Sequence, residues 1–194
     1  MIVVYGYGCD MAGAAKARRS ALNQIRRERK KFTYIDVLCN EKRSKSMTAN
    51  IARRLASPPN SLRTTAYVNE VMDRVIASLL SGEKVTLVGY SYGGSVVSRV
   101  AIGLKNMFGK VPNLKAITLG SIYIPSPAKT QGINISHYVY DNDIAGLCHK
   151  RSPKCSFVKF LKPKNGYNGL KSHLNYQKYI AAIAVTGSTN LNRL

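Results

Sequence analysis

The sequence predicts a single α/β domain, a three-layer α/β/α sandwich built on a mainly parallel sheet of five to six strands. Short apolar runs of strand character alternate with longer segments of helical periodicity, which is typical of a parallel sheet covered on both faces. The length of 194 residues and the hydrophobic content of 45% suit one domain with its own core. Neither an internal repeat nor a linker divides residues 1–194.

The first elements alternate between strand and helix. In chain order we predict a strand, a helix, a strand and a short helix over Ile2–Tyr5, Ala12–Lys30, Phe32–Leu38 and Thr48–Leu55. Asp10 is a suitable N-cap for the first helix, and a Pro-Pro pair stops the second. The clearest helical stripe of the chain then covers residues 68–80 and ends at Gly82, and its apolar residues are expected to pack in the core.

The second half continues the alternation around two irregular loops. The predicted strands and helices are Val85–Val88, Ser95–Phe108, Ala116–Leu119, Ser136–Tyr140 and Ser172–Val185, of which the second and the last are helices. Ser121–Asn134 and Gly146–Lys171 lack a regular pattern. Each follows the carboxyl end of a strand, where open parallel sheets place their sites. Residues 186–194 are expected to form a flexible tail.

The chain is strongly basic, with 30 Lys and Arg against 9 Asp and Glu and a net charge of +21. Much of this charge falls in residues 16–31, 42–54 and 150–164, and the last two runs contain no carboxylate. Each run alone is typical of a solvated face. Together they favour a polyanionic partner, either nucleic acid or an anionic membrane surface. Aromatic residues are not interleaved with the first two runs, so no stacking platform for single strands is expected.

The expected cellular compartment follows from the start of the sequence and from its cysteines. The chain opens directly on its first strand, and no apolar run is long enough for a signal peptide or a bilayer span. We therefore expect a soluble protein, intracellular rather than secreted, whose charge would associate it with nucleic acid or a viral particle. The cysteines are expected to remain thiols, and Cys148-His149 with Cys155 is too sparse for a zinc site. No metal and no cofactor is expected.

One short segment indicates the chemistry. Residues 85–94 read Val-Thr-Leu-Val-Gly-Tyr-Ser-Tyr-Gly-Gly, an apolar strand followed by Gly-x-Ser-x-Gly and a helical pattern. A serine becomes a nucleophile when it is held exposed beside a base, and a strand-to-helix turn holds it so. Gly89 and Gly93 leave the space that such a sharp turn needs. The segment predicts a nucleophile elbow with Ser91 at its tip.

An activated serine needs a histidine as base and usually a carboxylate that orients it. Only two carboxylates lie downstream of the elbow, Asp141 and Asp143. If the chain order is serine, acid, base, the histidine is His149 or His173. The cationic surroundings of His149 disfavour an imidazolium there, which favours His173 at the start of the last helix. His137 precedes both acids and is interpreted as a half-exposed strand residue.

Three short patches resemble a known family. Gly89-Tyr90-Ser91-Tyr92-Gly93, Asp143-Ile144 and His173-Leu174-x-Tyr176 look like the compact, capless end of the α/β-hydrolase superfamily, particularly the cutinase-like esterases and the class 3 lipases. The resemblance covers most of the chain in layout, but in motif only these patches. It implies a triad of Ser91, Asp143 and His173 and an esterase or lipase activity. The preference for Asp143 over Asp141 comes from this family pattern.

The oxyanion hole needs two backbone donors. The first would be the N–H of Tyr92, the residue after the nucleophile. By resemblance to hydrolases the second would be the N–H of Tyr7, in the loop after the first strand, with Cys9 or Asp10 next in line. These groups together predict two-step cleavage of a carboxylic ester, with an ester or a lipid as the first substrate, while thioesters and peptides stay open as alternatives. The apolar loop Ile122–Pro127 would shape the acyl pocket.

Two other functions stay open on the sequence alone. Gly6-x-Gly8 after a strand, with Gly13 and with Asp36 on the next strand, suits a dinucleotide-binding turn. That interpretation leaves the Ser91 elbow unexplained. The alternative of a different class is a hydrolase fold with little or no turnover that acts as a basic nucleic-acid-binding or assembly protein, because fold does not fix function.

Overall fold

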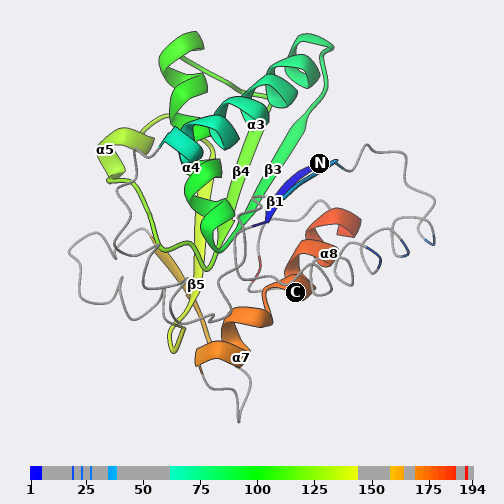
Figure 1. The fold of residues 1–194 in the computed structure, drawn as a ribbon, viewed down its shortest axis with the longest axis vertical. Coiled ribbons are helices and arrows are strands. Elements are labelled where there is room, and N and C mark those ends of the chain that lie inside the picture. The colour runs from blue at the N-terminus through cyan, green and yellow to red at the C-terminus, as the bar shows by residue number, and fades with distance from the viewer. Residues whose placement is uncertain are drawn as a thin grey trace.

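The chain folds around a six-stranded parallel sheet (Figure 1). The computed structural model describes residues 1–5, 35–38, 62–143, 158–163 and 169–186, together with Arg19, Asn23, Arg27 and Leu191. The strands lie in the order β2-β1-β3-β4-β5-β6, and each neighbouring pair is parallel. Their bounds are Ile2–Tyr5 (β1), Ile35–Leu38 (β2), Val85–Tyr90 (β3), Leu114–Leu119 (β4), Ile135–Tyr140 (β5) and Val158–Leu161 (β6). The predicted α/β class with a parallel sheet is confirmed.

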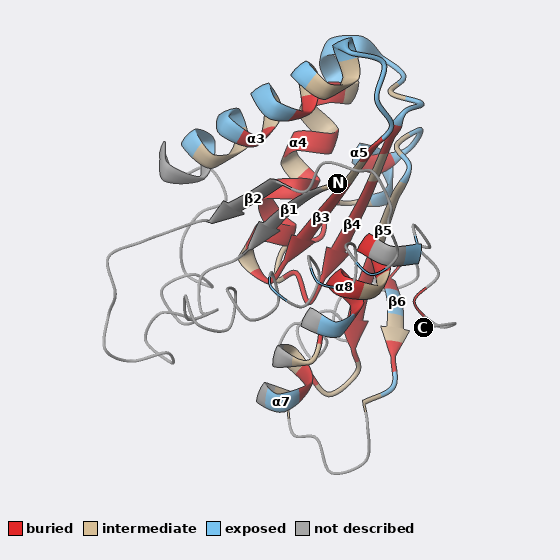
Figure 2. Cartoon of the chain, turned by 90° about the vertical axis from the view of Figure 1, so that its right-hand side faces the viewer, coloured by how far each residue is buried: buried red, intermediate tan, exposed pale blue. Residues whose placement is uncertain are grey.

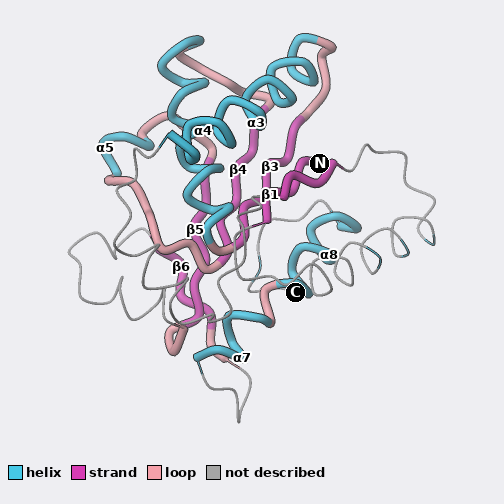
Figure 3. Tube along the Cα trace, in the orientation of Figure 1, coloured by secondary structure: helices cyan, strands magenta, loops and turns pink. Residues whose placement is uncertain are grey.

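Helices lie on both sides of this sheet (Figures 2 and 3). The described helices are α3 (Leu62–Leu80), α4 (Tyr92–Phe108), α5 (Pro127–Thr130), α7 (Gly169–Leu174) and α8 (Gln177–Thr186). α3 and α4 pack against each other and against β3. α8 covers the opposite face, where its apolar side chains meet those of β3, β4 and β5. The predicted helical stripe of residues 68–80 is confirmed within α3.

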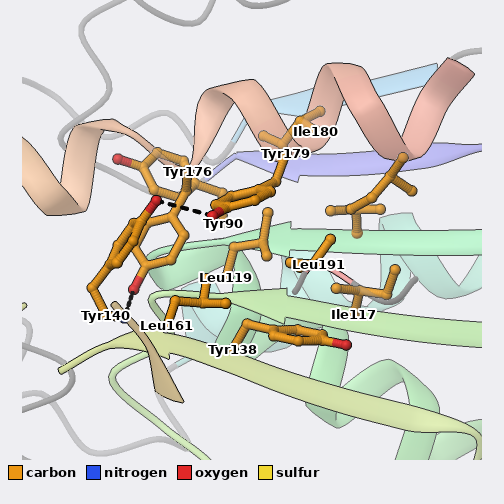
Figure 4. Close-up of a cluster of buried hydrophobic side chains, with 12 residues drawn as sticks. Tyr90, Ile117, Leu119, Tyr138, Tyr140, Leu161, Tyr176, Tyr179, Ile180 and Leu191 are labelled. Carbon is orange, nitrogen blue, oxygen red and sulfur yellow. Dashed lines mark hydrogen bonds between the residues drawn. The ribbon is translucent and has the colours of Figure 1, made fainter. Parts of the chain in front are cut away.

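Two apolar clusters fill the space between the sheet and its helices. One joins α3 and α4 to side chains such as Leu87 and Ala116. The other joins α8 to side chains such as Val88 and Ile117, and Figure 4 shows this second cluster. Adjacent strand residues therefore point to opposite faces, and both faces are buried. This double burial explains why the central strands read as nearly continuous apolar runs.

Three segments differ from the predicted secondary structure. β6 and α5 lie within the two stretches that were expected to be irregular. β6 is a four-residue edge strand in a basic stretch, so its pattern is too short to stand out from the loop around it. The predicted single helix 172–185 is instead two helices, α7 and α8. The break at residues 175 and 176 places His173 and Tyr176 beside the end of β3, where they are used in the site.

Two residues are more buried than predicted. His137 is 1% exposed, and its Nδ1 lies 2.7 Å from the Thr118 hydroxyl on the neighbouring strand. The prediction of a half-exposed residue was wrong because β5 lies inside the sheet, between β4 and β6, and has neighbours on both sides. Leu191 was assigned to a flexible tail but is 2% exposed and packs in the α8 cluster.

Several predictions fall outside the described residues, among them the short helix 48–55, the four cysteines and the basic run 42–54. In the predicted helix 12–30, the three described positions, Arg19, Asn23 and Arg27, are helical and exposed. The basic side chains of Lys159 and Lys162, in the third run, are also exposed. Among the helices of the described ranges, none combines the length and the apolar character that a membrane span requires.

Candidate active site

Ser91 lies at the tip of a sharp turn between β3 and α4. The strand ends one residue before it and the helix begins one residue after it. Its backbone has φ 55° and ψ −123°, and among the described non-glycine residues it alone has a positive φ. The Ser91 N–H donates a 2.8 Å hydrogen bond to the carbonyl oxygen of Leu119 at the end of β4. A strained conformation persists only where surrounding contacts determine it, and it is typical of functional sites.

Glycines around Ser91 allow the backbones to approach closely. A Cβ at Gly89 would lie 2.5 Å from the backbone oxygen of Gly93. A Cβ at Gly94 would lie 2.6 Å from the Cβ of Ser121, on the segment that follows β4. The prediction that Gly89 has no room for a side chain is therefore confirmed, and Gly94 has the same requirement.

Three polar side chains form a hydrogen-bonded chain at this turn. The Nε2 of His173 lies 3.0 Å from the Ser91 hydroxyl, and its Nδ1 lies 3.0 and 2.9 Å from the two carboxylate oxygens of Asp143. Ser91 is 7% exposed, the His173 side chain 19% and the Asp143 side chain 0%. The chain thus begins near the surface and ends at a buried acid. In this order the imidazole can accept the serine proton while the carboxylate holds its other nitrogen.

Of the two candidate acids, the structure brings Asp143 to the histidine. The Asp143 N–H donates a 3.1 Å hydrogen bond to the carbonyl oxygen of Tyr140, which closes a turn at the end of β5. Asp141 is half-buried, and its N–H donates to the carbonyl oxygen of Leu161 on β6. The turn therefore directs the second aspartate of the pair toward the site. His149, the other candidate base, lies outside the described residues.

Two tyrosines hold the acid and the base. The Tyr90 hydroxyl donates a 2.9 Å hydrogen bond to the carbonyl oxygen of His173, and the two rings are 5.3 Å apart. The Tyr176 hydroxyl donates a 3.0 Å hydrogen bond to Oδ2 of Asp143. Burial raises the pKa of Tyr176, and the nearby charge of Asp143 raises it further, so this phenol remains a donor. Sequence reasoning assigned neither ring a role, although both tyrosines belong to the short patches on which the family resemblance rests.

The remaining predicted site residues have mixed outcomes. Tyr92 is the first residue of α4, so its N–H stands at the positive end of the helix dipole, beside Ser91. Tyr7 lies outside the described residues, as do Cys9, Asp10 and the glycines of the alternative dinucleotide turn. In the loop predicted to shape an acyl pocket, Ile124 is buried against β5 and β6 and contributes to the core.

Comparison with known proteins adds no assignment to this geometry. No protein-family model matches the chain, and no curated protein matches it. Within the described ranges, no three His, Cys, Asp or Glu side chains are grouped so that they could hold a metal ion. The function is therefore inferred from the arrangement of Ser91, His173 and Asp143.

Proposed function

We propose that the protein is a serine hydrolase that cleaves carboxylic esters, with Ser91 as nucleophile, His173 as base and Asp143 as the acid that orients the base. One observation carries the proposal: the three side chains are hydrogen-bonded in series, and the serine is the positive-φ residue between a strand and a helix. This is the arrangement of a nucleophile elbow. In this proposal the fold is a minimal, capless α/β-hydrolase, a three-layer sandwich related to the cutinase-like esterases and the class 3 lipases.

The first half of the proposed reaction is acylation. His173 takes the proton of the Ser91 hydroxyl through Nε2 as the oxygen attacks the ester carbon. Asp143 holds the Nδ1–H and stabilises the imidazolium that forms. The imidazolium then gives its proton to the leaving alcohol as the carbon–oxygen bond breaks, which leaves an acyl group on the serine. Water attacks this acyl-enzyme in the second half, with His173 again as base, and the acid is released.

The negative charge that develops on the ester oxygen needs donors that are fixed in advance. The N–H of Ser91 is already bonded to Leu119, which supports the next amide, that of Tyr92, as the oxyanion donor. Each donor of this kind contributes about 3 kcal/mol to the transition state. The N–H of Tyr7 stays the prediction for the second donor.

The charge of the chain supports a proposal about the substrate. A net charge of +21 attracts anionic surfaces. An ester of an anionic lipid would combine this attraction with the chemistry of Ser91. The same charge would attract nucleic acid. We therefore propose basic residues such as Lys159 and Lys162 as the contact to a polyanion, without a choice between lipid and nucleic acid.

Labelling with a fluorophosphonate probe tests the proposal without knowledge of the substrate. The probe reacts with an activated serine, and mass mapping of the digested protein shows which residue carries it. We expect modification of Ser91 in the wild type, none in Ser91→Ala and a strongly reduced rate in His173→Ala. Ser98→Ala is the matched control, because it removes a buried serine hydroxyl from α4, two turns beyond Ser91, that donates its hydrogen bond to the Gly94 carbonyl oxygen and not to His173.

The labelling experiment also separates the two classes of function. If the folded wild-type protein takes up no probe at Ser91, the enzyme proposal is wrong and a basic binding or assembly protein is favoured. A salt titration of nucleic-acid binding then measures that alternative, since affinity based on phosphate contacts falls steeply with salt.

A further inference from the structure

Tyr176 links the acid of the site to the carboxyl end of strand β5. Its hydroxyl accepts a hydrogen bond from the N–H of Tyr140, the last residue of β5, and donates one to Oδ2 of Asp143. Both tyrosines are fully buried, and their rings lie 4.8 Å apart. Figure 4 shows these rings gathered where the segment that begins α8 meets the ends of the strands. The oxygen of Tyr176 is thus held from one side by the backbone and holds the carboxylate on the other.

The ring of Tyr176 packs against the backbone of a residue that must be glycine. Gly120 follows β4 and has φ +59°, and a Cβ there would lie 2.5 Å from Cε2 of Tyr176 and 3.1 Å from Oδ2 of Asp143. Tyr176 also meets His173 edge to face, at an interplanar angle of 88°. One side chain therefore touches both the acid and the base, and its position is fixed by packing.

A carboxylate that orients a histidine must not rotate. Asp143 places both oxygens near Nδ1 of His173, at 3.0 and 2.9 Å, and the Tyr176 hydroxyl binds the second of these oxygens. A hydrogen bond to an ionised acceptor is about twice as strong as a neutral one. Its loss would leave Oδ2 without this donor on a side chain that is fully buried.

We propose that Tyr176 is a positioning residue that fixes the rotation of the Asp143 carboxylate and, through it, the orientation of the His173 imidazole. The proposal rests on the serine hydrolase function proposed above. It extends that function from three residues to four, with Tyr176 acting through Asp143 and not on the substrate.

A double-mutant cycle on the rate of fluorophosphonate labelling tests the proposal. Tyr176→Phe removes only the hydroxyl and is expected to slow labelling of Ser91 between about 10-fold and 100-fold, the range that corresponds to one hydrogen bond to a charged group. In an Asp143→Asn background the same change should slow labelling less than about twofold, because the partner through which it acts is already altered. Tyr179→Phe is the matched control, since it removes a buried hydroxyl from the same cluster that bonds Tyr140 instead of the acid.

Tyr176→Phe supports the proposal if it slows labelling in the protein that keeps Asp143 but not in the Asp143→Asn variant. An equal loss in both backgrounds, or a loss shared by Tyr179→Phe, assigns Tyr176 to packing alone and overturns it. An unchanged rate in folded Tyr176→Phe overturns it as well.

A spectroscopic measurement makes the result independent of catalysis. The Nδ1 proton of His173, held by Asp143, should give a proton resonance downfield of the amides, and Tyr176→Phe should shift or broaden it while Tyr179→Phe leaves it in place. If wild-type Ser91 takes up no probe but this resonance still responds, the proposed function fails and the positioning role stands. If it does not respond, the positioning role fails. Where Tyr176→Phe does not fold, a fluorotyrosine at position 176 keeps the ring and the hydroxyl, and an unmoved resonance again overturns the proposal.

Discussion

Tyr90 and His173 are 83 positions apart in the sequence, yet the hydroxyl of the first donates a 2.9 Å hydrogen bond to the backbone carbonyl oxygen of the second. Tyr90 is the last residue of β3, directly before the proposed nucleophile, and His173 lies in the last turn of α7. The residue next to Ser91 thus anchors the segment that carries the base. The separation of Ser91 and His173 depends on this anchor as well as on their own hydrogen bond.

Tyr90→Phe should therefore loosen the base segment. We expect a loss of about 1 kcal/mol in the free energy of unfolding, as for one intramolecular hydrogen bond, and a several-fold slower labelling of Ser91. Denaturant titration and probe kinetics measure the two effects. Tyr138→Phe is the control, because it removes the hydroxyl of another buried strand tyrosine, one that accepts a 3.3 Å hydrogen bond from the Lys159 ammonium and does not hold His173. Labelling at the wild-type rate in Tyr90→Phe would show that the anchor is dispensable.

A second prediction compares two glycines that differ in what surrounds them. Gly89→Ala would place a Cβ 2.5 Å from a backbone oxygen of the elbow, whereas Gly103→Ala, within α4, would place one 2.8 Å from the flexible end of Met72. We expect Gly89→Ala to lower the free energy of unfolding by about 1–3 kcal/mol or more, because the backbone of Gly93 cannot move away without disturbing the turn. Gly103→Ala should be neutral or should stabilise the helix by up to about 1 kcal/mol. Thermal melting of both variants is the measurement, and equal effects would contradict the geometry of the elbow.

The strand-to-helix turn around Ser91 could be predicted from the sequence because its residues are consecutive. A strand, Gly-x-Ser-x-Gly and a helix follow one another without a gap, so local pattern is enough to place Ser91. The scarcity of acids reduced the candidate acids to Asp141 and Asp143, and the order of residues in the family pattern favoured Asp143. Both inferences needed the order of residues and no knowledge of packing.

The supporting residues could not be predicted in this way. Tyr176 bonds Asp143 across 33 positions, and the contact depends on where the last helix breaks into α7 and α8. Exposure of His137 depends on whether its strand is central or at an edge, and β6, which makes β5 internal, is too short to show a clear pattern. Register and helix breaks arise from tertiary packing, so a single sequence holds little signal for them.

The two aspartates give a third prediction. Asp143→Asn should slow Ser91 labelling by about 10³-fold to 10⁴-fold, since an amide at this position favours the wrong histidine tautomer. Asp141→Asn should stay within about twofold of the wild type, because the Asp141 N–H donates a hydrogen bond to the Leu161 carbonyl oxygen on β6, and the substitution preserves that bond. The rate of probe labelling in the two variants shows which aspartate orients the histidine. The reverse order of effects would move the acid of the site to Asp141.

The last prediction concerns stability at high pH. Burial raises the pKa of Tyr176 in the folded protein, whereas in the unfolded chain the phenol titrates at about 10. Below pH 10 the phenol is protonated in both states, and its stabilising contribution is complete. Above pH 10 the unfolded state releases this proton and the folded state keeps it, so the free energy of unfolding falls by about 1.4 kcal/mol per pH unit for this one group. Tyr176→Phe cannot release the proton, and its stability should therefore decline less steeply above pH 10 than that of the wild type. Denaturant titrations of both proteins between pH 8 and 12 measure the slopes, which should be parallel below pH 9. Parallel slopes above pH 10 as well would mean that the hydroxyl of Tyr176 is not held in a buried, protonated state beside Asp143.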